Sequence, residues 1–230
     1  MLTALGDSII KGVVLSDNKQ LAGIRRYQVS SQPLTERCAQ LLHTDIINLG
    51  KFGCTAPAGL KIAEHNAQQI AASTSVLIEY GGNDSNYCWP QIAQNPHQQH
   101  LPYTTIHDFV NAYQSILAHV IAVGSIPIML SLPPMDADKY FHFFSQGWND
   151  TQKENVLSWL GGSTSHISTG HELYNIATHK IAKQANIKII DITSSFLAER
   201  NYSDFLCDDG IHPNELGQSR IADIIANELG

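Results

Sequence analysis

The sequence predicts an α/β fold in which helices cover a parallel β-sheet. Short apolar runs typical of strands alternate with longer segments of helical periodicity, as is usual for parallel sheets. The length of 230 residues suits one large domain better than two small ones. Apolar residues make up 43% of the chain, which is enough for one hydrophobic core and excludes a chain that is mainly disordered.

Five strands and five long helices are expected along this domain, which spans residues 1–230. The strands are predicted at residues 2–5, 46–49, 76–80, 126–132 and 187–192. The helices are predicted at residues 33–43, 57–72, 104–123, 171–185 and 214–229. In the helix at 104–123, for example, Phe109, Tyr113, Ile116 and Val120 recur on one face, which we expect to pack on the sheet.

Two stretches interrupt this alternation, and we call them the first insertion (residues 85–103) and the second insertion (residues 133–170). Both follow strand ends, where ligands bind in open α/β sheets, so they are placed to form a lid or specificity wall, or serve only as cover. Their aromatic residues are Tyr87, Trp89, Tyr140, Phe141, Phe143, Phe144 and Trp148. Two interpretations stay open: these rings line an acyl or alcohol pocket, or they form a private core of the insertions.

Charge and hydropathy exclude several classes of partner. There are 14 Lys and Arg against 21 Asp and Glu, a net charge of −7 without a basic run, so we expect no nucleic-acid binding. The longest apolar stretch, residues 120–132, is too short to span a bilayer and contains Gly124 and Pro127, so no membrane insertion is expected. The opening MLTALGDS lacks the regions of a signal peptide, which predicts a cytoplasmic protein unless an export signal has been removed. The sequence leaves the oligomeric state open.

No cofactor or metal site is predicted. The four cysteines are Cys38, Cys54, Cys88 and Cys207. They include no CxxC pair and are expected to be free thiols. His97, His100 and His107 lie close together, but in a Gln-rich segment without carboxylates. The segment beginning at His171 has Asn175 where a zincin helix requires its second histidine, and the glycine motifs of nucleotide sites are absent from the sequence.

A first candidate for chemistry is Gly6-Asp7-Ser8, directly after the first strand. A serine at a strand-to-helix junction presents its hydroxyl at the edge of the sheet, where helix N-terminal amides support developing negative charge. Ser8 is equally suited to act as a helix N-cap, so the motif alone does not assign a role.

A second candidate precedes the last predicted helix, in the segment DDGIHPN at residues 208–214. Asp209 and His212 stand three residues apart, so that on one turn the carboxylate can accept from one ring nitrogen and leave the other as a base. A metal site or a solvated turn is the alternative, but this segment contains one histidine and no second ligand pattern.

Two further glycine-containing blocks follow strand ends. In EYGGND, residues 79–84, Asn83 offers a side-chain amide donor beside paired glycines that allow close backbone approach. In NLGKFGCT, residues 48–55, Gly50 and Gly53 can each offer a bare backbone N–H.

Together these four blocks resemble those of the SGNH hydrolases, also called the GDSL esterases and lipases, in the order that the family has them. By this resemblance the nucleophile is Ser8, the glycine donor is Gly53, the asparagine donor is Asn83, and the acid and base are Asp209 and His212. Gly53 matches better than Gly50 because it stands before Cys54-Thr55. The opening block has Ile9 where the family name has Leu, which keeps the apolar contact.

The resemblance implies a flavodoxin-like, three-layer α/β/α sandwich with a five-stranded parallel sheet. It also implies a serine esterase: His212, oriented by Asp209, takes the proton of Ser8, which attacks an ester carbonyl and forms an acyl-enzyme. Backbone N–H groups of Ser8 and Gly53 and the Asn83 amide hold the oxyanion.

Asp7 and Asp84 have no direct role in this scheme and are assigned to supporting hydrogen bonds or turn structure. The substrate is expected to be a small-molecule ester. Lysophospholipase or thioesterase activity, and a catalytically inactive ligand-binding relative on the same fold, remain the alternatives.

Overall fold

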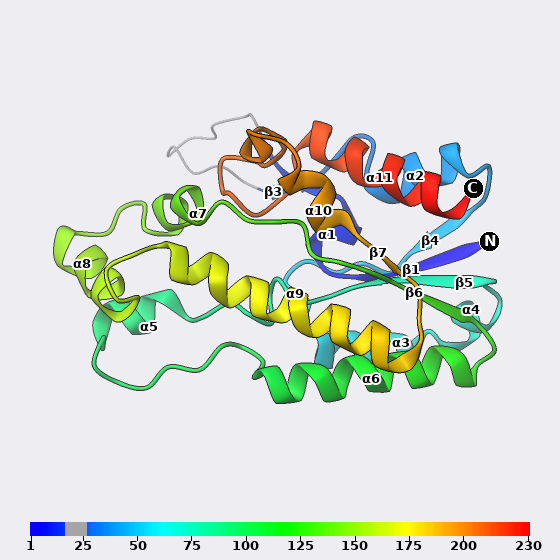
Figure 1. Cartoon of the computed structure of the whole chain (residues 1–230), viewed down its shortest axis with the longest axis horizontal. Coiled ribbons are helices and arrows are strands. Elements are labelled where there is room, and N and C mark those ends of the chain that lie inside the picture. Colours follow the sequence, from blue (N-terminus) through cyan, green and yellow to red (C-terminus); the bar gives the residue numbers. More distant parts are fainter. Residues whose placement is uncertain (17–26) are drawn as a thin grey trace.

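The computed structural model describes residues 1–16 and 27–230 of the chain. Its central sheet has the strand order β4-β1-β5-β6-β7, and every neighbouring pair is parallel. The strands are β1 (Leu2–Gly6), β4 (Ile46–Asn48), β5 (Ser75–Glu79), β6 (Ile126–Leu130) and β7 (Ile189–Ile190). Helices cover both faces (Figure 1), which confirms the predicted α/β/α sandwich with a five-stranded parallel sheet.

One face of the sheet packs against α3 (Ala56–His65), α6 (Ile106–Ala122) and α9 (Ser165–Ala185). The opposite face packs against α2 (Leu34–Leu41) and α11 (Glu215–Leu229). Alternate residues of β5 enter the two cores: Val76 and Ile78 lie in the first and Leu77 in the second. Burial on both faces is the reason why these strands appear in the sequence as continuous apolar runs.

The predicted helices are present with changed bounds. The helix expected at 57–72 is two helices, α3 and α4 (Ala67–Ala71), which meet at Asn66, whose side chain donates to the Ile62 carbonyl at 2.7 Å. The strand expected at 187–192 is shorter, because Asp191 caps α10 (Ile192–Leu197) by accepting from the Ser194 N–H at 2.9 Å. The α9 helix begins six residues before the expected position, at Ser165 rather than at His171.

Several short elements lie outside the predicted set. The α1 helix (Ser8–Lys11) follows β1 directly, and the antiparallel pair β2 (Val13–Leu15) and β3 (Tyr27–Val29) follows it. A 3-10 turn, η1 (Tyr202–Phe205), precedes the last loop.

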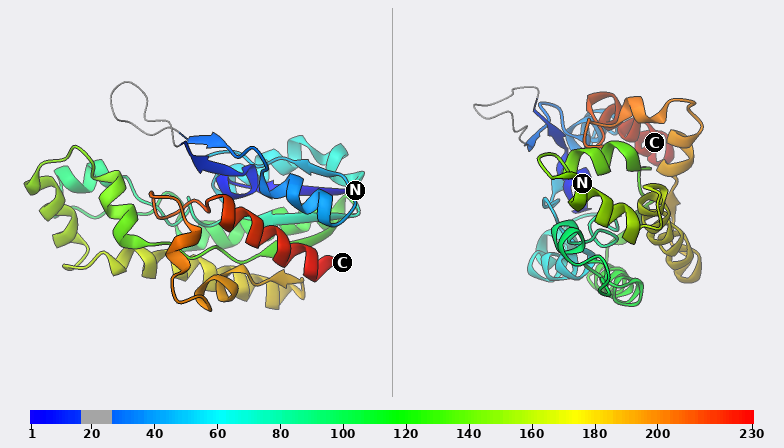
Figure 2. Two further views of the ribbon diagram at one scale, coloured as in Figure 1. Left: turned by 90° about the horizontal axis from the view of Figure 1, so that it is seen from above. Right: turned by 90° about the vertical axis from the view of Figure 1, so that its left-hand side faces the viewer.

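The two insertions form a helical extension beyond the carboxyl ends of the strands (Figure 2). The first insertion contains α5 (Trp89–Gln94), and the second contains α7 (Ala137–Phe144), α8 (Asp150–Trp159) and the start of α9. These helices share a hydrophobic cluster of their own, with Trp89, Ile92, Tyr140 and Val156 among its buried members. The extension therefore walls the edge of the sheet at which Ser8 lies.

None of the helices in residues 1–16 and 27–230 is both long and apolar enough to cross a membrane.

Candidate active site

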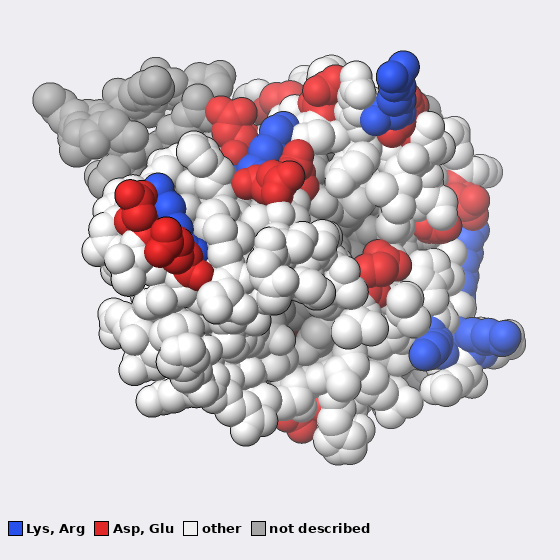
Figure 3. Space-filling view, turned by 60° about the vertical axis from the view of Figure 1, so that its left-hand side comes forward, with Lys and Arg blue, Asp and Glu red and all other residues white. Residues whose placement is uncertain are grey.

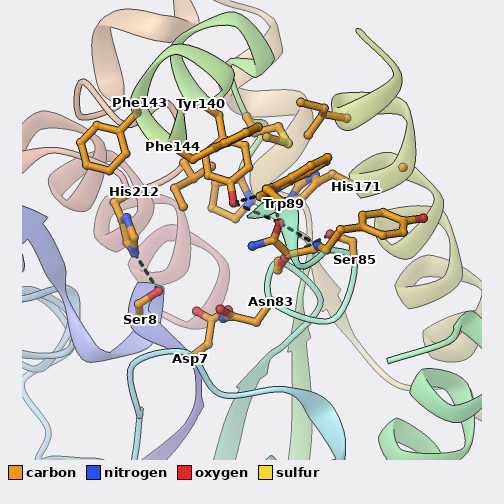
Figure 4. Close-up of a pocket in the computed structure, with 18 of the residues that line it drawn as sticks. Asp7, Ser8, Asn83, Ser85, Trp89, Tyr140, Phe143, Phe144, His171 and His212 are labelled. Carbon is orange, nitrogen blue, oxygen red and sulfur yellow. Dashed lines mark hydrogen bonds between the residues drawn. The ribbon is translucent and has the colours of Figure 1, made fainter. Parts of the chain in front are cut away.

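Ser8 lies at the sharp turn from β1 into α1. Asp7 caps this helix by accepting from the Ile9 N–H at 2.8 Å, so Ser8 is its first residue and is not its cap. A side chain on Gly6 would place its Cβ 2.3 Å from Ile10 Cγ1 and 2.8 Å from the Glu79 carbonyl oxygen. Only glycine fits there, and the tight turn directs the Ser8 hydroxyl toward His212 (Figure 4).

The Ser8 Oγ lies 2.9 Å from His212 Nε2, although the two residues are 204 positions apart in the chain. The other ring nitrogen, Nδ1, lies 2.6 Å from Asp209 Oδ2. Because the ionised carboxylate can only accept, Nδ1 carries the proton, and Nε2 is left to accept from the Ser8 hydroxyl. The three side chains thus form a continuous chain from an acid through a base to a hydroxyl.

The turn that carries Asp209 and His212 is fixed from several sides. Asp209 Oδ1 accepts from the N–H groups of Ile211 and His212, both at 3.1 Å. Gly210 has φ +72°, and its carbonyl accepts from the Asp136 N–H at 2.8 Å. A Cβ at Gly210 would lie 2.4 Å from the Asp136 carbonyl oxygen, so glycine allows the turn to pack directly on the second insertion.

Asp209 is fully buried, which by itself favours the neutral acid. The hydrogen bond and charge of His212, together with the two backbone N–H groups, outweigh this burial and bring the pKa of Asp209 below its ordinary value. The carboxylate therefore stays ionised and holds the imidazole in one tautomer.

Two aromatic rings shield the imidazole of His212. The Phe52 ring stacks on it, with centroids 6.0 Å apart and an interplanar angle of 9°. The Tyr27 ring is tilted, with its centroid at 4.9 Å. Neither residue was assigned a role from the sequence: Tyr27 lies in β3 and Phe52 in the loop after β4, and only the tertiary fold brings them to the histidine.

Asn83 lies on the loop after β5 and faces Asp7. Its Nδ2 donates to Asp7 Oδ2 at 2.8 Å, while the other Asp7 oxygen holds the Ile9 N–H. An amide nitrogen carries two hydrogens, so one of them remains for a ligand. Asp7 thus connects the start of the Ser8 helix to the Asn83 amide, a supporting hydrogen bond of the kind expected from the sequence.

The two candidate glycines differ in how their N–H groups are used. The Gly50 N–H donates to Asn48 Oδ1 at 2.8 Å, so it is already occupied. The N–H groups of Gly53 and Ser8 donate to no acceptor in the described residues. Gly53 has φ +69° and open space at its Cβ position, and its neighbour Phe52 lines the cavity described below. This contrast agrees with the choice of Gly53 as the backbone donor.

Asp84 joins the loops that carry Gly53 and Asn83. Both of its carboxylate oxygens lie close to the Ala56 N–H, at 3.0 and 3.1 Å, at the start of α3. Burial raises the pKa of Asp84 to about 6.

Glu79, which has no assigned role from the sequence, is buried beside Asp7, and burial and the Asp7 charge raise its pKa well above the ordinary range.

A cavity of about 700 Å³ opens from this centre into the insertions. Ser8, Asn83 and His212 line it, whereas Asp209 lies behind the histidine. Figure 3 shows the side of the molecule on which the insertions lie, and this side is hollowed and carries few charged side chains.

Five of the seven aromatic residues singled out in the insertions line this cavity: Tyr87, Trp89, Tyr140, Phe143 and Phe144. Phe141 and Trp148 do not line it, and they pack against Phe144 at centroid distances of 5.4 and 5.6 Å. The insertions therefore have a private core whose inner rings also form a cavity wall, so both interpretations of the sequence describe part of the same cluster.

The structure does not gather His97, His100 and His107 into a common site. His100 Nε2 bonds the Asn95 carbonyl at 2.8 Å, and His107 Nε2 bonds the Asn111 amide at 3.0 Å. Among the residues that the structure describes, no group of three His, Cys, Asp or Glu side chains is arranged to hold a metal ion.

Comparison with known proteins places the chain in a family. It belongs to the GDSL-like Lipase/Acylhydrolase family, whose profile matches residues 4–220. A curated relative, the GDSL esterase/lipase CPRD49 of Arabidopsis thaliana, is 23% identical over 183 residues, which cover 77% of this chain and 63% of the relative. The matched region is thus less than two thirds of that relative's length.

Solved structures show the same fold. The lipase/acylhydrolase from Enterococcus faecalis superposes with a TM-score of 0.66 at 17% identity, covering 99% of this chain and 94% of that one. A catalytic mutant of the acetylxylan esterase Axe2 from Geobacillus stearothermophilus gives 0.63 at 17% identity, covering 100% and 93%. The family predicted from the four sequence blocks and the predicted fold are confirmed.

Proposed function

We propose that the protein is a serine esterase that cleaves a carboxylic ester through an acyl-enzyme on Ser8. Two contacts carry this proposal. His212 Nε2 lies 2.9 Å from Ser8 Oγ, and His212 Nδ1 lies 2.6 Å from Asp209 Oδ2, with Ser8 and His212 lining a cavity. A structural serine or a capping serine has no need of a buried histidine and carboxylate in this order.

In the first step His212 Nε2 removes the Ser8 proton as Oγ bonds to the ester carbonyl carbon. The carbonyl π electrons move to its oxygen and give a tetrahedral oxyanion. When this collapses, the C–O bond to the alcohol breaks, and the leaving oxygen takes the proton from His212. The products of this step are the free alcohol and an ester of the acyl group with Ser8.

The oxyanion is held by three donors in this scheme. They are the Ser8 and Gly53 N–H groups, which are without acceptors in the described chain, and the second hydrogen of Asn83 Nδ2. Asp7 fixes the Asn83 amide before the substrate arrives, so little reorganisation is needed during the reaction. In the second step His212 removes a proton from water as the water oxygen bonds to the acyl carbon. The bond between this carbon and Ser8 Oγ then breaks, Oγ takes the proton back from His212, and the free acid leaves.

The cavity lining favours an uncharged ester over a phospholipid or a coenzyme thioester. Phosphate groups are usually bound by Arg or Lys, and no such side chain lines the cavity in the described part of the chain. The acetylxylan esterase among the structural relatives is named for an uncharged acetyl ester of a sugar. We propose no particular alcohol on that basis.

The test is hydrolysis of p-nitrophenyl acetate by the purified protein and by Ser8→Ala. Loss of turnover in Ser8→Ala with an unchanged melting temperature is the expected result. Ser85→Ala, a second serine on the cavity wall, serves as the matched control and should keep its activity. Equal turnover in wild type and Ser8→Ala would reject the proposal, and a folded protein without any turnover would favour the inactive ligand-binding relative.

A further inference from the structure

We propose that the part of the cavity built by the insertions is an acyl pocket. Its ligand is a hydrocarbon acyl group longer than acetyl, bearing a hydrogen-bonding substituent that contacts His171. This inference rests on the proposed esterase function and assigns the acyl half of its substrate.

The reacting carbon of an ester bears the carbonyl oxygen, the leaving oxygen and the acyl group. The positions required of the two oxygens assign the acyl group to the insertions. The carbonyl oxygen must point to Gly53 and Asn83, and the leaving oxygen must face His212 Nε2 to receive its proton. Beside His212 lie the rings of Tyr27 and Phe52, at the rim. The alcohol is therefore assigned to that rim, and the remaining direction leads from Ser8 toward Trp89, Tyr140 and His171 (Figure 4).

The wall of this chamber is largely apolar, and two of its rings, Trp89 and Tyr140, have their polar atoms hydrogen-bonded within the wall. Trp89 Nε1 donates to Asn86 Oδ1 at 2.8 Å, and the Tyr140 hydroxyl donates to the same oxygen at 3.0 Å. Trp89 and Phe144 stack with centroids 4.8 Å apart and an angle of 6°. Since Asn86 satisfies both polar atoms within the wall, the rings offer the cavity mainly hydrocarbon surface.

The cavity is larger than an acetyl ester requires. Its whole volume, which includes the rim assigned to the alcohol, is about 700 Å³, within the range of roughly 300 to 1,000 Å³ that is usual for ligands of drug size, and more than half of its lining residues belong to the insertions. An acetyl group would leave the aromatic wall in contact with water, whereas a longer chain would cover it and gain the free energy of apolar burial.

The chamber also has polar side chains, among them Asn86, His166 and His171, and His171 is the less exposed of the two histidines. It lies on α9 and lines the cavity, but its ring forms no hydrogen bond with any described residue. Burial lowers the pKa of His171 to about 4, so the ring is neutral at physiological pH. A neutral imidazole offers one donor and one acceptor, and a site built with such a group favours a ligand with a matching hydroxyl, amide or carbonyl.

The experiment compares kcat/KM for p-nitrophenyl acetate, butyrate, hexanoate and octanoate with the terminally hydroxylated esters of the three longer acids. Wild type is expected to prefer at least one longer ester to acetate and to prefer its hydroxylated form by about tenfold, the value of one good hydrogen bond. His171→Phe should remove the preference for the hydroxyl, and His171→Gln should retain most of it. Phe144→Ala should reduce the preference for longer chains over acetate.

Matched controls come from α7, the helix that carries Phe144. Phe141→Ala removes a ring that does not line the cavity, and His142→Phe replaces an exposed histidine; both should leave every ratio unchanged. Ser8-dependent hydrolysis of acetate without any gain for longer esters would overturn the acyl pocket while the esterase proposal stands. A hydroxyl preference that survives in His171→Phe would overturn the role of His171. Absence of Ser8-dependent turnover with every ester would overturn both proposals.

Discussion

Asp7 Oδ2 and Asn83 Nδ2 are joined by a hydrogen bond of 2.8 Å between two loops that leave neighbouring strands, β1 and β5. Asp7 also caps the helix that begins with Ser8, so one carboxylate holds both the helix of the proposed nucleophile and the proposed oxyanion donor. In the proposed reaction Asp7 itself does not contact the reacting atoms.

We therefore expect Asp7→Ala to lower kcat by about tenfold or more with little change in KM, because the Asn83 amide loses its fixed orientation. Loss of the cap should also cost about 1 kcal/mol of stability. Asp191→Ala, which removes the cap of α10, controls for this second effect. If both variants lose the same fraction of activity, Asp7 acts on stability alone.

Asn83→Ala should lower kcat by about 100-fold to 1,000-fold, the usual cost of one oxyanion donor. The donor acts in the transition state, so KM should change little. Steady-state kinetics with p-nitrophenyl acetate separate the two constants, and a change confined to KM would place Asn83 in substrate binding instead.

Asp209→Asn should reduce kcat/KM by about 10,000-fold, because an amide in place of the carboxylate can donate to Nδ1 and turn the histidine into the wrong tautomer. The neighbouring exposed Asp208 provides the control, and Asp208→Asn is expected to retain activity within a few-fold. Comparable losses in the two variants would contradict the assignment of Asp209 as the acid.

Asp84 predicts a specific dependence of stability on pH. Its pKa is raised from 3.8 to about 6 in the folded protein, so the folded state binds more protons than the unfolded state between these values. The contribution of Asp84 is fully present below pH 4 and is lost as the pH rises through 6, a change on the order of 3 kcal/mol. Between pH 4 and 8, the melting temperature of Asp84→Asn should increase relative to that of wild type as the pH rises. A constant difference between the two would contradict the raised pKa.

The sequence was sufficient to predict the sheet and, to within one residue, the ends of β1 and β5. Apolar runs predict where β1 and β5 end, and the carboxyl ends of parallel strands share one edge, so the meeting of Ser8 and Asn83 follows from topology. His212 reaches the same edge because it stands on the turn that precedes the last helix. Gly53 was preferred to Gly50 by its place before Cys54-Thr55, whereas the contact that occupies the Gly50 N–H, its bond to Asn48, is one that no spacing predicts.

The cavity wall could not be predicted in the same way. The Ser- and Thr-rich stretch before His171 has no apolar periodicity, so the first turns of α9 were missed, and with them the face that His171 presents to the cavity. Tyr27 lies in the short strand β3 and Phe52 in the loop after β4, and both contact His212 only in the folded chain. Residues of this kind contact the substrate region from elements without a periodic signal, and only tertiary structure locates them.

Whether Ser8 is the activated nucleophile can be tested most directly by labelling the protein with a fluorophosphonate, which bonds covalently to an activated serine, and locating the label by mass spectrometry. We expect a single modified residue, Ser8, with labelling strongly reduced in His212→Ala although Ser8 is still present, because the histidine supplies the base. Labelling at another serine, or equal labelling of Ser8 without His212, would contradict the assignment of Ser8 as the activated nucleophile.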